Sequence, residues 1–206
     1  MMYFTRESYE KMQIRGRFPL KIDNKENWIE QLEEFSTLSS YYDKVYYELL
    51  LQHIPEVKAD ILQGKNMTDK EVAEKLYTRI NEMANEWKDL CNSYKAEYED
   101  IKYKLPLSMQ VLSKYNFHDS EVLSFKKDIN DNLVLELDRY SLIFKKVSKF
   151  EIIEDIVGDT WLYEEVHLSH IGEFEFQVLL YSSEGFLNLN EIKIIADDVC
   201  IEVKEL

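Results

Sequence analysis

The hydrophobic pattern of this chain changes its period near Phe117. Before this residue, apolar side chains recur about every 3.6 positions, as on one face of an α-helix, and after it they alternate every second position, as on a β-strand. This change predicts an α+β protein with an N-terminal helical bundle, followed by a C-terminal antiparallel β-sheet or sandwich of about seven to eight strands. We place the helical domain at residues 1–116 and the β domain at 117–206.

Start and stop signals divide the helical half. Thr5 is a suitable N-cap for a short helix that runs to about Ile14, and Asp23 announces a second helix. Pro55 suits the first turn of another helix, which Gly64 should end. A last short helix is expected over residues 107–115.

The strongest local signal is a capping box at residues 68–71, Thr-Asp-Lys-Glu, which should begin a long helix that reaches almost to Pro106. Nine apolar positions follow in eight steps over 29 residues, about 3.6 residues per step, the period of a straight helix in a bundle rather than of a coiled coil. These positions are Val72, Leu76, Ile80, Met83, Trp87, Leu90, Tyr94, Tyr98 and Ile101. The stripe is typical of a packed core.

Alternation is clearest in two segments of the β half. Leu133, Leu135 and Leu137 alternate with polar residues, and so do the apolar residues of 174–180. Polar, turn-forming breaks occur at 128–132, 157–159, 170–172 and 182–185. Such short connections require mostly antiparallel pairing, because parallel neighbours need long crossovers.

The net charge of −15 is unevenly distributed. Residues 1–115 hold 17 basic and 20 acidic side chains, a balance of −3, whereas residues 116–206 hold 8 and 20, a balance of −12. A field of this sign repels phosphate backbones and argues against nucleic-acid binding. The acids keep a sheet-rich half soluble and discourage edge pairing, or they serve a basic partner surface.

Targeting and cofactor signals are weak throughout. Cys91 and Cys200 are isolated thiols, typical of a reducing compartment, and neither a secretory signal nor a membrane span is expected. The few glycines form no phosphate loop, and no serine lies in a nucleophile motif. We therefore predict a cytoplasmic protein with no cofactor.

Several stretches resemble a known family. They are residues 3–13, the segment Phe-His-Asp-Ser-Glu-Val at 117–122, Asp-Thr-Trp-Leu-Tyr-Glu-Glu-Val at 159–166, and residues 194–199. Together they resemble the bacterial domain of unknown function 4085 family over nearly the whole chain. The resemblance implies a bacterial, cytoplasmic protein and no activity. A looser likeness to bacterial immunity proteins, at the His-Asp-Ser entry into the β half, points to binding.

The best candidate site is His118 with Asp119, Ser120 and Glu121, where the helical half passes into the first strand. A carboxylate beside an imidazole suits acid–base work or, with Glu164, Glu165 or residues 197–198, metal binding. The competing interpretation is a local turn in which Asp119 satisfies backbone N–H groups, and neighbours on a strand point to opposite faces.

Two other motifs have a structural alternative. His167 and His170 are three residues apart, which on a strand places them on opposite faces and argues against joint chelation. Trp161 and Tyr163, beside Glu164 and Glu165, mix aromatics with acids as interaction surfaces do, although alternating aromatics also suit a half-buried strand.

The leading functional prediction is a non-enzymatic protein-binding module, immunity-like by analogy, whose acidic β half meets a basic or mixed partner. Its weak candidate binding residues are His118, Asp119, Trp161, Tyr163, Glu164 and Glu165, and no residue is assigned as catalytic or metal-binding. The alternative is a metal-assisted hydrolase that uses His118, Asp119 and the Glu164/Glu165 pair. The sequence indicates no oligomeric state.

Overall fold

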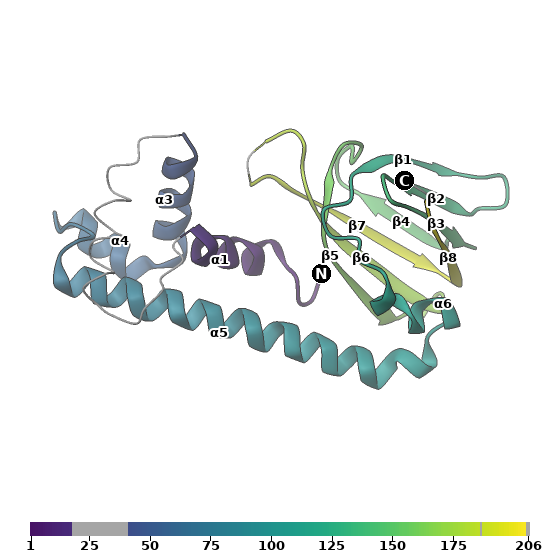
Figure 1. The fold of residues 1–206 in the computed structure, drawn as a ribbon, viewed down its shortest axis with the longest axis horizontal. Coiled ribbons are helices and arrows are strands. Elements are labelled where there is room, and N and C mark those ends of the chain that lie inside the picture. Colours follow the sequence, from purple (N-terminus) through teal and green to yellow (C-terminus); the bar gives the residue numbers. More distant parts are fainter. Residues whose placement is uncertain (18–40, 186, 205–206) are drawn as a thin grey trace. The chain divides into compact units, whose positions relative to one another are not determined.

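The computed structural model describes residues 1–17, 41–185 and 187–204, which form two compact units (Figure 1). One unit comprises Met1–Arg6 together with Cys91–Leu206, and the other comprises Glu7–Leu90. Two helices cross from one unit to the other, so the units do not coincide with the change of sequence pattern at residue 116. The domain boundary drawn there stays a prediction.

The helices follow the sequence signals closely. They are α1 (Arg6–Arg17), α3 (Tyr41–His53), α4 (Pro55–Leu62), α5 (Lys70–Ile101) and α6 (Leu107–Gln110), with short 3-10 turns at Lys102–Lys104 and Leu112–Lys114. The start of the helix expected from Asp23 lies outside the described residues, and the later part of its apolar stripe, to Leu50, falls in α3. None of the described helices is both long and apolar enough to cross a lipid bilayer.

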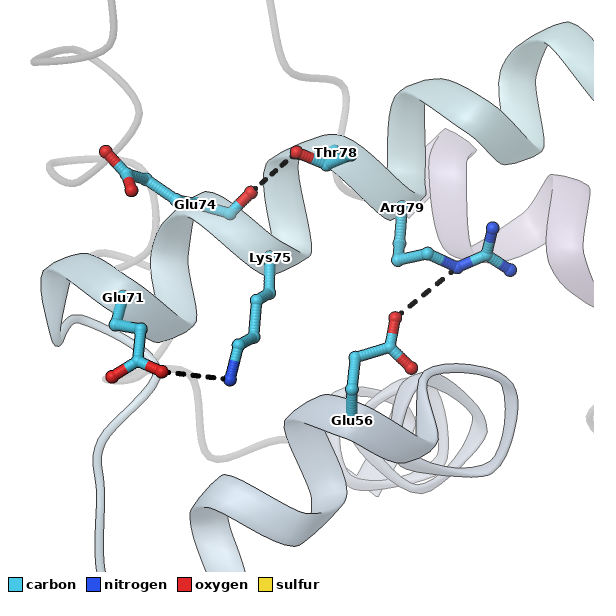
Figure 2. A pocket seen from close by; sticks show the side chains of 6 residues that line it. All are labelled: Glu56, Glu71, Glu74, Lys75, Thr78 and Arg79. Atoms are coloured by element: carbon cyan, nitrogen blue, oxygen red, sulfur yellow. Dashed lines mark hydrogen bonds and ion pairs between the residues drawn. The ribbon is translucent and has the colours of Figure 1, made fainter.

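Within the Glu7–Leu90 unit, α4 and α5 are joined by a charged cluster. The buried Asp60 accepts from Lys65 Nζ at 3.0 Å and from Lys75 Nζ at 2.6 Å. Glu71, which the sequence predicted as part of a capping box, binds both lysines. Gly64 ends α4 with a φ of 86°. Beside this cluster is a charged hollow that Glu56 and Arg79 also line (Figure 2).

Eight strands form two four-stranded antiparallel sheets, which confirms the predicted α+β class. The first sheet has the order β1-β2-β3-β8, and the second has the order β4-β7-β6-β5 (Figure 1). Their bounds are β1 Val122–Lys127, β2 Leu133–Leu137, β3 Tyr140–Lys145, β4 Lys149–Ile152, β5 Thr160–Leu168, β6 Phe174–Tyr181, β7 Leu189–Ala196 and β8 Asp198–Val203. All four predicted breaks fall between strands.

The apolar core of the unit that comprises Met1–Arg6 and Cys91–Leu206 lies between the two sheets. Leu133, Leu135 and Leu137 of β2 are fully buried, as are Phe174 and Phe176 of β6. Side chains of the two sheets belong to one apolar cluster, to which Tyr98 of α5 and Met109 of α6 also belong. The alternating pattern in the sequence therefore marks the inner face of a sandwich.

Candidate functional site

Strand β5 positions most of the predicted site residues, and a bulge in it decides where each one points. The pairing with β6 shifts between Trp161 and Tyr163, so that Leu162 is an extra residue. As a result, Trp161, Glu164 and Val166 oppose residues of β6 that are fully buried. Glu165 and His167 oppose Gln177 and Glu175, on the outer face of the sheet.

On the inner face, Glu164 is partly buried and has one specific donor. The indole Nε1–H of the fully buried Trp161 donates to Glu164 Oε2 at 2.8 Å. Burial raises the pKa of the Glu164 carboxyl, because this hydrogen bond and the nearby His118 only partly offset the loss of hydration. Glu164 therefore takes up a proton more readily than an ordinary glutamate does.

His118 and Asp119 occupy a turn next to the start of β5. Asp119 has a left-handed backbone with a φ of 64°, and its N–H donates to the carbonyl of Trp161 at 2.9 Å. His118 Nδ1 lies 3.0 Å from Asp119 Oδ1, and the His118 ring meets Tyr163 edge-on at 5.6 Å. The exposed fractions of the two side chains are 44% and 78%, so both reach solvent.

On the outer face, Glu165 holds the first residues of the chain. Its side chain is fully buried, and it accepts from the backbone N–H groups of Met2 at 2.8 Å, Tyr3 at 2.8 Å and Phe4 at 2.5 Å. His167 Nε2 approaches the same carboxylate at 3.0 Å. Burial alone would raise the pKa of Glu165, but these hydrogen bonds outweigh it and lower the pKa below its ordinary value.

His167 lies between two carboxylates. Its Nδ1 is 3.0 Å from Glu97 Oε1 on α5, and its Nε2 is 3.0 Å from Glu165 Oε2. The Tyr3 hydroxyl also donates to Glu97. The pKa of His167 is raised above its ordinary value, mainly because the ring hydrogen-bonds to Glu165. Burial opposes this shift, and the hydrogen bond to Glu97 adds to it.

Aromatic side chains also hold the N-terminal segment against β5. Phe4 stacks on Tyr163 with ring centroids 5.1 Å apart and meets Tyr94 edge-on at 5.2 Å. The Tyr94 hydroxyl accepts from the backbone N–H of Val166 at 3.0 Å, and burial raises the pKa of this tyrosine. Thus α5 contributes Tyr94 and Glu97 to the outer face, and one long helix ties the segment to the sheet.

A hollow of about 540 Å³ opens on the β4–β7 side of the same sheet. Its lining includes Glu151 and Glu191, whose side chains are 54% and 42% exposed, and Ile153, which as a whole residue is 84% exposed. Phe150 and the buried Ile192 also line it, and Met1 does as well. Gln177 and Lys193 also line it, so the hollow mixes apolar, polar and charged residues, of which Phe150 and Ile152 pack against the core.

The structure thus brings together five of the six predicted residues, His118, Asp119, Trp161, Tyr163 and Glu164, around the start of β5. Trp161 and Glu164 lie on the inner face, whereas Tyr163 and Glu165 lie on the outer face, where both contact Phe4. Trp161 and Glu165 are fully buried and have structural roles, so a partner could reach the exposed His118 and Asp119 but not these two.

The predicted acidic helpers from the last strand are engaged elsewhere. Asp198 accepts from Ser108 at 2.7 Å and pairs with Lys145 at 3.1 Å, whereas Asp197 pairs with Lys146. Within the described residues, no group of three or more His, Cys, Asp or Glu side chains is arranged to hold a metal ion. The metal-assisted hydrolase stays a prediction, which thermal melts with a panel of divalent ions would test.

Sequence reasoning gave no role to Tyr3, Phe4, Tyr94 and Glu97. The only signal for Tyr94 was its place in the apolar stripe, and the pairing of residues 2–4 with residue 165 spans more than 160 positions. No local pattern carries such a long-range pairing. It could have been found only from the tertiary structure.

Fold and site together define an α+β protein with a two-sheet sandwich whose outer face holds its own N-terminal segment. Residues 3–185 match the family model described as "Protein of unknown function (DUF4085)", and the chain belongs to this family. The family description names no activity. No curated protein and no solved structure matches the chain.

Proposed function

We propose that this protein is a bacterial, cytoplasmic, non-enzymatic binding module that uses the hollow between β4 and β7 to hold a basic segment of a partner protein. The observation that carries the proposal is the lining of the hollow, in which Glu151 and Glu191 lie with the exposed Ile153, while Phe150 and Ile152 pack against the core. Met1, Gln177 and Lys193 complete the lining. Protein interfaces also place apolar side chains beside polar and charged ones.

Charge supports a basic partner rather than an acidic one. Lys193, which lines the hollow, is paired with Glu175 at 2.7 Å, and Lys149 is paired with Glu151 at 2.9 Å. The N-terminal amine of Met1 lies 3.8 Å from Glu191 Oε2. The surrounding half of the chain carries a balance of −12, so a cationic segment would be attracted over a distance comparable to the Debye length, about 8–10 Å.

The edge position of β4 adds a second reason. This strand pairs only with β7 in its sheet, and strand edges that are not paired can accept an extended peptide. Edge strand β5 differs, because its Val166 N–H is bound by Tyr94 and its first residues contact the turn at 118–120. An extended basic segment with aliphatic residues would therefore fit the β4 side.

The test compares two double charge reversals. Glu151→Lys with Glu191→Lys changes the rim of the hollow, and Glu184→Lys with Glu202→Lys changes net charge equally at exposed positions away from it. Proteins captured from a bacterial lysate by the wild type would be purified and their affinities measured at increasing salt concentration.

We expect the first variant to weaken binding at least tenfold, the control to weaken it less than threefold, and binding to fall with salt. Equal losses in the two variants would show that only overall charge acts. A captured protein that binds both variants like the wild type would contradict the proposal.

A further inference from the structure

The two ring nitrogens of His167 impose a condition on its protonation state. Each lies 3.0 Å from a carboxylate oxygen, one from Glu97 and one from Glu165. A neutral imidazole has one N–H and one lone pair, so it can donate to only one of these carboxylates and must turn its lone pair toward the other. Only the imidazolium satisfies both contacts.

The same two carboxylates hold the N-terminal segment. Glu165 accepts the backbone N–H groups of Met2, Tyr3 and Phe4, and Glu97 accepts the Tyr3 hydroxyl. If His167 loses its proton, the fully buried Glu165 carboxylate loses the cation beside it and keeps only neutral donors, so its buried charge is less well compensated. Release of the segment would let water reach this carboxylate.

The other groups that face His167 do not replace the lost charge. Tyr3 stacks on its ring at 6.5 Å, and Tyr94 of α5 lies at the same centroid distance. On β6, Glu175 is directly opposite His167 in the register, and it is paired with Lys193. The surroundings of the imidazole are therefore two glutamates in contact, a third glutamate opposite and two neutral phenols.

We propose that Met1–Phe4 is a pH-sensitive latch, which stays seated on β5 while His167 is protonated and is released when His167 loses its proton. Met1 also lines the hollow between β4 and β7, so release of the latch changes one wall of that hollow. This last consequence rests on the proposed function. The latch itself does not.

The direction of the pH effect follows from linkage. In the seated state, hydrogen bonds to Glu165 and Glu97 raise the pKa of His167. Both carboxylates stay beside the ring on release, but water then reaches Glu165 and screens its charge, so the pKa should fall toward the ordinary value of 6.5. Between these two pKa values, the released fraction should rise by up to tenfold for each pH unit, and above the higher value it should level off.

The latch can be tested on the full chain without any partner. Exchange of the Tyr3 and Phe4 amide protons would be followed by NMR from pH 6 to 9 and corrected for the intrinsic pH dependence of exchange. We expect protection in the wild type to fall by up to tenfold per pH unit above about 6.5. His167→Gln, which is neutral at every pH, should remove this dependence, and His118→Gln should keep it.

A direct measurement of His167 keeps the test decisive if His167→Gln does not fold. Nitrogen-15 shifts of the wild-type ring should show both nitrogens protonated at pH 6, with loss of the proton coinciding with the fall in amide protection. A singly protonated ring at pH 6, or constant protection through the titration of His167, would overturn the proposal. Failure of the charge-reversal binding test would leave these results unaffected.

Discussion

Glu164 and Glu165 are neighbours in the sequence, yet they lie on opposite faces of β5 and their pKa values are shifted in opposite directions. Glu164 has a single donor from Trp161, and burial raises its pKa. Glu165 is more deeply buried, but three backbone N–H groups and His167 lower its pKa. The comparison teaches that burial alone does not set the charge of a carboxyl group. The number of donors aimed at it does.

The largest difference between the two faces should appear in the free energy of unfolding when each glutamate is replaced by alanine. Glu165→Ala leaves three N–H groups and His167 without their acceptor, and breaking a buried charged cluster costs about 3–5 kcal/mol. Glu164→Ala leaves one indole N–H without a partner and should cost about 1–2 kcal/mol. Urea unfolding of both variants measures the two losses. Equal losses would remove the distinction between the faces.

Trp161→Phe tests the single donor on the inner face. It removes the indole N–H and part of a fully buried ring, so we expect a loss of about 1–3 kcal/mol in the free energy of unfolding. A double-mutant cycle with Glu164→Gln separates the hydrogen bond from the lost volume. A coupling energy of zero would show that the 2.8 Å contact contributes nothing to stability.

The two glutamates should also give pH dependences of opposite sign. The pKa of Glu164 is raised from 4.5, so its contribution to stability is present below pH 4.5 and is lost as the pH rises toward the folded-state value. The pKa of Glu165 is lowered from 4.5, so its contribution is present above pH 4.5 and is lost as the pH falls through the folded-state value.

Thermal melts of Glu164→Gln and Glu165→Gln from pH 3 to 8, each compared with the wild type, measure these two contributions. We expect the difference between wild type and variant to shrink with rising pH at residue 164 and to grow with rising pH at residue 165. Differences that change in the same direction would contradict the assignment of the two faces.

The smallest effect is expected at the exposed edge of the site. His118 pairs only with Asp119 among the ion pairs of the described residues, and both side chains are well exposed. Such a pair contributes little, so His118→Gln should change the free energy of unfolding by less than about 0.5 kcal/mol. Chemical denaturation measures this. A loss above about 2 kcal/mol would indicate a structural role that the exposure of His118 does not suggest.

Much of the fold could be predicted because it depends on local patterns. Alternation at Leu133, Leu135 and Leu137 marked the inner face of a strand, and Gly64 marked the end of α4 through its left-handed backbone. The start of α5 was predicted within two residues of Thr68, although Glu71 binds Lys65 and Lys75 in addition to any capping role. These features depend on residues a few positions apart.

The site was predictable only in part. The residues around the start of β5 were identified, but the faces they occupy depend on the bulge at Leu162, which exchanges inner and outer positions for everything that follows. Strict alternation from Trp161 would have placed Glu165 on the same face as Trp161. The bulge instead places Glu164 there, and Glu165 meets the N-terminal segment.

By itself, the sequence determined the α+β class, the order of helices and strands, and the uneven distribution of charge, because hydrophobic spacing and turn residues act over short distances. Only the tertiary structure decided that Glu165 would hold Met2, Tyr3 and Phe4, and that His167 would bridge this glutamate to Glu97. The physical reason is that a buried carboxylate takes whichever donors the fold brings to it, and these donors are separated from it by most of the chain.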